Sequence, residues 1–253
     1  MTRQSFFFTL IVFLSCTGLL PGQSAGNPPH PTTNDQYDSI DVNNIRMWLN
    51  NNGNMSYNER MSGNGFEWPK NSGKTLVFED GLIFGGMVDG NLHVGGSTYR
   101  QGLQAGPILS GGQASDPNDP RNRVYKIRLV SAAEYTALPP AAQARLRKDF
   151  NEWPAADGAP YIDTDRNGFY NPDFDKWLAD SLSSDKPWFV GDEVVWFASN
   201  DMDTVRVRGL YGTKPAAFEI HSLIWEYNRC PELMNVVFVK HTLINKNNKP
   251  MTD

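Results

Sequence analysis

Glu193-Val194-Val195-Trp196-Phe197-Ala198 is the stretch from which the fold can be read most directly. It is a short apolar run rich in β-branched and aromatic residues, without Gly or Pro, which is typical of a buried strand. Two later runs, 218–227 and 235–245, alternate partly between apolar and polar residues, as half-buried antiparallel strands do. The sequence therefore predicts a β-sandwich-like region over residues 187–253. We expect it to be incomplete at its C-terminal edge, because residues 245–250 form a turn pattern that no further strand follows.

The preceding part of the chain, residues 43–130, also has a β pattern. Between residues 75 and 100, short apolar runs are separated by Asp80-Gly81 and Asp89-Gly90, dipeptides that favour tight hairpin turns. We expect a β-meander there. Residues 26–42 are rich in Asn, Pro, Thr and Asp, and this composition predicts an exposed linker.

A helical segment is expected between the two β regions, over residues 131–186. Ser131 and Glu134 have the spacing of a capping box, and Pro140 suits the first position of a second helix. Four apolar residues then share one helical stripe that should face the core: Ala142, Leu146, Phe150 and Trp153. The predicted fold class is mainly β, a β-meander plus a β-sandwich-like sheet, with a small helical insertion and a calcium loop.

The first 25 residues have the features of a secretory signal peptide. Arg3 gives a positive start, an apolar run continues to Leu20, and small residues near Ala25 suit cleavage. A single membrane anchor and a lipoprotein signal at Cys16 are the alternatives. Without residues 1–25 no apolar run is long enough to span a membrane, and Cys230 is the one remaining cysteine, which excludes an internal disulfide. We expect a secreted or outer-surface protein.

Charge and motif spacing exclude several partners. Removing residues 1–25 leaves 22 basic and 28 acidic residues, an acidic balance that disfavours nucleic acid. Ser72-Gly73-Lys74-Thr75 ends like a nucleotide-binding P-loop, but Trp68 stands where the motif needs its first Gly and a strand pattern follows. We therefore expect no nucleotide.

The residues 163–175 predict a calcium site. Asp163, Asp165 and Asn167 are spaced to turn three side-chain oxygens inward, Gly168 permits the sharp bend, and the Phe169 carbonyl falls at the seventh position of the loop. Calcium needs six to eight such oxygens. This beginning matches the loop of calcium-binding helix-loop-helix proteins.

The end of the segment departs from that pattern. The twelfth position is Phe174, where a bidentate Glu is needed, and the nearest acids are Asp173 and Asp175. We therefore expect Ca²⁺ in a loop of another type, closed by Asp175 and Asp173. The alternative is an Asp- and Asn-rich turn without an ion.

Signals for catalysis are weak. The chain has no G-x-S-x-G motif, and its four histidines are scattered, although His221 and His241 could meet on neighbouring strands and bind zinc. Glycoside hydrolysis needs only a pair of carboxylates, which a chain with 28 acidic residues can supply. Of the seven tryptophans, Trp68 and Trp188 are the best candidates for exposed sugar-stacking platforms. The sequence does not decide whether the protein is an enzyme, although it favours a protein without catalytic activity.

Six short strings together resemble the N-terminal part of large, uncharacterised secreted proteins of Bacteroidetes-type bacteria. They are FEWPK at 66–70, GGSTYRQGLQAG at 95–106, VYKIR at 124–128, DTDRNG at 163–168, GDEVVWF at 191–197 and NDMD at 200–203. Members of that family end in a sorting domain for type IX secretion, which has no counterpart before Asp253. The resemblance implies a calcium site in the Asp-rich loop and Asp192 as an additional ligand, but it implies no reaction.

We therefore expect an exported, calcium-stabilised structural or adhesive surface module without catalytic activity. The alternative is a carbohydrate-binding or glycan-degrading secreted protein. In either case the expected partner is a cell-surface glycan or another surface protein.

Overall fold

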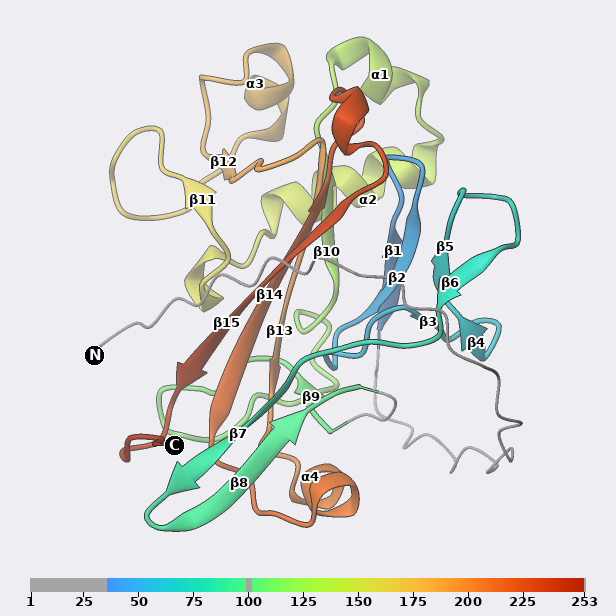
Figure 1. The fold of residues 1–253 in the computed structure, drawn as a ribbon. Helices are drawn as coiled ribbons and strands as arrows, with labels where there is room; N and C mark the ends of the chain where they lie inside the picture. The colour runs from blue at the N-terminus through green and yellow to red at the C-terminus, as the bar shows by residue number, and fades with distance from the viewer. Residues whose placement is uncertain (1–35, 99–101, 253) are drawn as a thin grey trace.

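Strand β13 (Glu193–Asn200) lies at the centre of the largest sheet, and all of its residues are buried. The computed structural model describes residues 36–98 and 102–252, so the predicted signal peptide lies outside the described residues. β13 pairs on one side with β14 (Phe218–Glu226), which in turn pairs with β15 (Val237–Asn245). On its other side β13 pairs with β10 (Tyr125–Arg128) and β9 (Gln104–Ala105) (Figure 1). All pairs in this sheet are antiparallel, as the sequence predicts.

The two faces of β13 belong to two hydrophobic cores. Val194, Trp196 and Ala198 point into a core shared with the helices, whereas Val195 and Phe197 point into a core shared with a smaller sheet. This alternation follows from the two-residue period of a strand. Antiparallel sheets often have one face in solvent, and their strands then alternate between apolar and polar residues. Both faces of β13 are covered, so its sequence can be apolar throughout.

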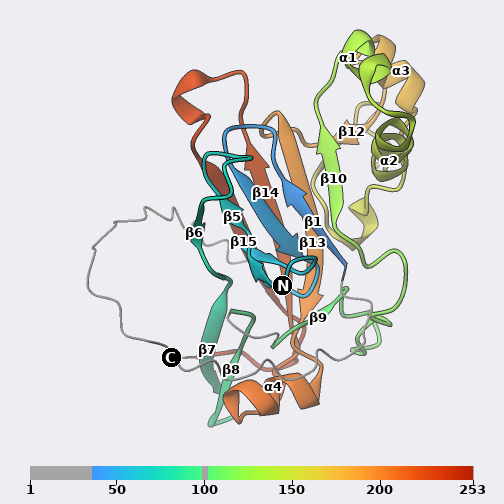
Figure 2. The same ribbon diagram turned by 90° about the vertical axis from the view of Figure 1, so that its right-hand side faces the viewer.

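The smaller sheet has the order β1 (Tyr37–Ile40), β2 (Arg46–Asn50), β5 (Phe66–Glu67) and β6 (Thr75–Val77). Figure 2 shows it covering one face of the central sheet. β1 corrects the sequence analysis, which places residues 26–42 in a linker. Ile40 is fully buried beside the apolar face of β2, and the burial of this face outweighs the polar composition around it.

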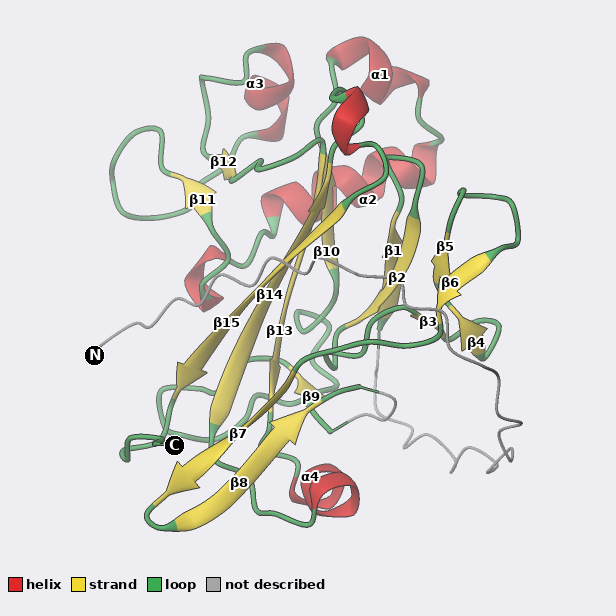
Figure 3. Cartoon of the chain, viewed as in Figure 1, coloured by secondary structure: helices red, strands yellow, loops and turns green. Residues whose placement is uncertain are grey.

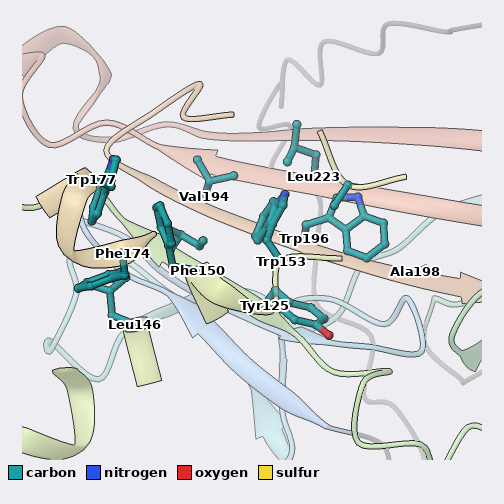
Figure 4. Close-up of a cluster of buried hydrophobic side chains, with 12 residues drawn as sticks. Tyr125, Leu146, Phe150, Trp153, Phe174, Trp177, Val194, Trp196, Ala198 and Leu223 are labelled. Atoms are coloured by element: carbon teal, nitrogen blue, oxygen red, sulfur yellow. The ribbon is translucent and has the colours of Figure 1, made fainter. Parts of the chain in front are cut away.

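The helices pack on the opposite face, within the predicted range 131–186 (Figure 3). They are α1 (Ala132–Ala137), α2 (Pro140–Asn151) and α3 (Phe174–Ala179), with a 3₁₀ turn at Ala155–Asp157. The capping box at Ser131 and Pro140 at the start of α2 are confirmed. The buried stripe Leu146, Phe150 and Trp153 meets Phe174, Trp177 and Trp196 in an aromatic core (Figure 4).

The predicted meander between residues 75 and 100 is wrong in one half. The ribbon of β7 (Ile83–Val88) and β8 (Asn91–Gly96) turns at Asp89-Gly90, as predicted. Asp80-Gly81, however, makes no hairpin, because β6 pairs with β5 instead of β7. Gly81 has a packing role: a Cβ atom there would lie 1.6 Å from the Ser97 carbonyl oxygen.

Two short ribbons and one further helix complete the described chain. The ribbons are β3 (Tyr57–Asn58) with β4 (Gly63–Asn64), and β11 (Tyr161–Ile162) with β12 (Lys186–Pro187). Helix α4 (Thr204–Tyr211), which the sequence analysis missed, begins after the N-cap Asp203 and ends before Gly212 at φ +73°. Within the described ranges, no helix combines the length and apolar character needed to cross a bilayer.

Candidate metal centre

The ribbon of β11 and β12 holds the Asp-rich loop in place. Ile162 pairs with Lys186, so residue 163, where the loop starts, lies beside residue 185, where the chain returns to the ribbon. The return is completed by α3 and a turn at residues 180–185. This arrangement brings two segments about 20 residues apart to one place.

Three carboxylates meet at this point: Asp163, Asp165 and Asp185. One oxygen of each lies within 4.8 Å of the others, a spacing that a single cation can bridge. Asp165 is exposed and Asp163 is half-buried, while Asp185 is only 3% exposed. The cluster therefore has a buried base and an open side.

Backbone N–H groups fix the two loop carboxylates. The amide of Gly168 donates to Asp163 Oδ2 at 2.8 Å, and that of Asn167 donates to Asp163 Oδ1 at 3.2 Å and Asp165 Oδ1 at 3.1 Å. These bonds, that of Gly168 above all, lower the pKa of Asp163 and keep it ionised. Gly168 has a φ of +85°, so the predicted bend is confirmed.

Asp185 is the member that the sequence analysis missed. Its Oδ1 accepts from the Thr164 amide at 2.8 Å and its Oδ2 from the Asn171 amide at 3.1 Å, so it spans the loop from beneath. In the sequence it lies in Ser183-Ser184-Asp185-Lys186, which has no ligand spacing. No local signal could have found it, because only the β11–β12 pairing brings it to the loop.

Asn171 connects the cluster to the predicted backbone ligand, Phe169. In one orientation of the Asn171 side-chain amide, its nitrogen donates to the Phe169 carbonyl at 3.1 Å and to Asp185 Oδ2 at 3.0 Å. In the other orientation, Oδ1 accepts from Asn167 Nδ2 at 2.9 Å and also faces these same two oxygens, an arrangement that a cation between the oxygens would stabilise. The Phe169 carbonyl is thus close to the carboxylates, whereas its side chain is 75% exposed.

Asn167 stands within the loop but uses its oxygen locally. Its Oδ1 accepts from the Phe169 amide at 2.7 Å, and its Nδ2 donates to Asp165 Oδ2 at 2.8 Å. An amide oxygen has two lone pairs, so Asn167 Oδ1 can keep the first of these bonds and still offer a lone pair to a cation.

Two other predicted ligands, Asp173 and Asp175, have separate partners. Asp173 is the N-cap of α3 and accepts from the Lys176 amide at 3.1 Å. Asp175 forms a bidentate pair with Arg147 at 2.7 and 2.8 Å, and this arginine lowers the pKa of Asp175. They are not members of the carboxylate cluster.

Asp192, the ligand implied by the family resemblance, lies directly before β13. Its Oδ2 accepts from the amides of Asn228 and Arg229 at 2.7 and 2.9 Å. It fixes the turn that follows β14, and the structure does not bring it to Asp163 and Asp165.

The cluster has no basic partner in the part of the chain that the structure describes. The ion pairs found there join no Lys or Arg to the three carboxylates, and neighbouring Lys186 donates to the Ser181 carbonyl instead. Converging like charges without a counterion repel one another, and calcium is bound in proteins by such carboxylate, carbonyl and amide oxygens. The donor set therefore fits a hard cation.

The histidines and the exposed tryptophans are the weaker site candidates from the sequence. His221 and His241 lie on adjacent strands but on opposite faces, since His241 pairs with Ser222, so they do not meet. His221 contacts Glu219 at 2.7 Å, and His241 contacts Ser222 Oγ at 3.0 Å. Trp68 and Trp188 are exposed, at 40% and 43%, and Trp153, Trp177 and Trp196 are buried, as predicted.

Comparison with models of known protein families, with curated proteins and with solved structures finds no match.

Proposed function

We propose that the protein is an exported structural or adhesive module of the cell surface that is stabilised by Ca²⁺ at Asp163, Asp165 and Asp185. The observation that carries this proposal is the convergence of three carboxylates within 4.8 Å, one of them buried, without a basic partner among the described residues. Export is inferred from the sequence of residues 1–25.

The position of the cluster suggests what the ion does. Asp163 and Asp165 belong to the loop that leaves β11, while Asp185 directly precedes β12 and the segment that enters β13. A cation shared by these residues would close the crossover of residues 163–185, whose exposed, polar backbone loses conformational entropy on folding. The proposed role is therefore to fix the helical layer to the central sheet.

Calcium removal tests this role. We expect a chelator to lower the melting temperature of the full chain by roughly 5 to 10 °C, the shift for a ligand at about 100 times its Kd. Asp163→Ala combined with Asp165→Ala should abolish the response. Asp175→Asn is the matched control, since it lies in the same segment but pairs with Arg147, and it should keep the response. A melting curve of the unaltered protein that does not change with chelator would refute the proposal.

Carbohydrate binding is the second candidate, favoured by the exposed indole rings of Trp68 and Trp188. Trp68 Nε1 donates to Asn235 Oδ1 at 2.9 Å, which holds that ring at the surface. Aromatic rings of this kind offer a flat apolar face with a polar edge. A glycan array tests the idea: binding to one sugar class that is lost in Trp68→Ala or Trp188→Ala would favour this function over a purely structural one.

A further inference from the structure

Trp68 lies at the surface, yet its indole ring is held in one orientation. The residue directly follows β5 and is 40% exposed. Its backbone amide donates to the Lys74 carbonyl at 3.0 Å, which closes the loop between β5 and β6, and its Nε1–H donates to Asn235 Oδ1 at 2.9 Å. A large exposed ring that is restrained at both its backbone and its polar edge offers a preformed contact surface.

Trp188 provides the comparison within the same protein. It is 43% exposed, almost the same fraction, and its backbone amide donates to the Pro160 carbonyl at 3.0 Å. In the part of the chain that the structure describes, however, no side chain bonds to the Trp188 indole nitrogen. Only the Trp68 ring has its orientation set by a hydrogen bond, so it loses less conformational freedom when a ligand binds.

Two asparagine amides form the polar edge beside the Trp68 ring. Asn235 Oδ1 accepts from Trp68 Nε1 at 2.9 Å and from Asn44 Nδ2 at 3.1 Å, and both asparagines are exposed. An indole N–H can only donate, so the Asn235 atom that faces it is the oxygen. An amide oxygen can only accept, so the Asn44 atom that faces Asn235 is the nitrogen. These contacts determine the orientation of both amides.

This orientation leaves one donor group and one acceptor for an outside partner. Asn235 Nδ2 and Asn44 Oδ1 have no hydrogen-bond partner among the described residues. The backbone of Asn44 is also anchored, since its amide donates to the Met234 carbonyl at 3.0 Å and its carbonyl accepts from the Lys70 amide at 2.7 Å. We call Trp68, Asn44 and Asn235 the Trp68 platform: an apolar ring with a fixed donor and a fixed acceptor at its edge.

The charged side chains near the platform have partners of their own. Lys70 Nζ donates to the Asp41 carbonyl, and Arg46 pairs with Glu67 at 3.0 Å. The hydrogen-bonding groups that the platform itself offers are amides, which carry no charge. The platform therefore suits a neutral ligand better than an acidic one.

We propose that the Trp68 platform binds a neutral pyranose sugar, with one face of the sugar on the indole ring and its hydroxyls bonded to Asn235 Nδ2 and Asn44 Oδ1. A pyranose ring with equatorial hydroxyls has an apolar face of C–H groups and a polar edge, which matches an indole ring with amides at its edge. A hydroxyl both donates and accepts, so it can bond to either amide atom. The proposal rests on carbohydrate binding, the second candidate function, and assigns it to Trp68 instead of Trp188.

The test uses the full chain with nitrogen-15 in its tryptophans, titrated with cellohexaose and, separately, with mannohexaose while the indole N–H signals are followed by NMR. The Trp68 signal is assigned by its loss in Trp68→Phe. We expect at least one of the two sugars to shift this signal, with a Kd of about 1 mM, the order of affinity that one sugar ring provides.

Variants then locate the site, with binding measured on the sugar signals. Trp68→Ala should weaken binding by about tenfold or more, and Trp188→Ala, the matched control, should change it by less than about twofold. Asn235→Asp keeps an oxygen for Trp68 Nε1 but lacks the Nδ2 donor, so it should weaken binding about three- to tenfold while the ring stays in place. Unchanged affinity in Asn235→Asp would remove the amide edge from the site.

The outcomes separate this proposal from the broader function. A sugar that binds and is lost in Trp188→Ala but kept in Trp68→Ala would refute the assignment to Trp68 and leave carbohydrate binding intact. Indole signals that stay unchanged with both sugars would refute carbohydrate binding as well. The chelator response of the melting temperature is measured independently of either result.

Discussion

Replacing Glu226 with glutamine should remove a large part of the pH dependence of folding stability. Glu226 is fully buried at the end of β14, directly opposite Glu193 in the neighbouring strand. Its Oε2 accepts from the Asn43 amide at 3.2 Å, but its Oε1 has no partner in the described chain. Burial, assisted by the negative charges of Glu193 and Asp41, raises the pKa of Glu226 from 4.5 to about 8.

The direction of the effect follows from linkage. The folded protein keeps the Glu226 proton up to about pH 8, while the unfolded chain releases it near the ordinary pKa of 4.5. The contribution to stability is therefore complete below pH 4.5 and is lost as the pH rises towards 8. Each pKa unit corresponds to about 1.4 kcal/mol, so the full loss is about 5 kcal/mol, of which about 2 kcal/mol falls between pH 6 and pH 8.

Urea unfolding followed by tryptophan fluorescence at pH 6, 7 and 8 measures this loss. Glutamine resembles the protonated carboxyl in shape and does not titrate, so Glu226→Gln should gain about 2 kcal/mol relative to the unaltered protein over this range, or roughly 4 to 8 °C in melting temperature. Other titrating groups contribute equally to both proteins and cancel in the difference. Glu232→Gln, an exposed change in the loop after β14, should keep the original pH dependence.

The contradicting result is a difference in unfolding free energy, between the Glu226→Gln variant and the unaltered protein, that changes by less than about 0.5 kcal/mol from pH 6 to pH 8. That result would mean that Glu226 is ionised in the folded protein, and hence that its environment supplies a positive charge or water.

Three further outcomes are expected. Phe150→Ala should cost about 3–5 kcal/mol in urea unfolding, because this fully buried ring packs against the Trp177 ring, with the two centroids 4.7 Å apart and the planes tilted by 34°; a cost below about 1 kcal/mol would contradict its place in the core. Asp185→Asn should weaken calcium binding in calorimetry about tenfold or more, and equal affinities in the two proteins would remove Asp185 from the site. The His241 ring should stay neutral down to pH 5 in NMR titration, since burial lowers its pKa to about 4, and a midpoint near 6.5 would show that it is hydrated.

Local sequence determined much of this protein. The runs at 193–198, 218–227 and 235–245 become β13, β14 and β15. Their continuous or alternating apolar residues are buried when the runs pair as strands of an antiparallel sheet. The capping box at Ser131 and the bend at Gly168 are also as predicted, since each depends on residues within one turn of chain.

Only the tertiary structure decided which distant residues meet. Asp185 joins Asp163 through the pairing of β11 with β12, and Gly81 faces the Ser97 carbonyl instead of forming a hairpin. Likewise the register of β14 and β15 separates His221 from His241. Register and the choice of strand partner are set by the burial of whole faces, a property summed over many residues that no short motif contains. The sequence therefore predicts the loop of the candidate metal centre, and the fold supplies its buried carboxylate, Asp185.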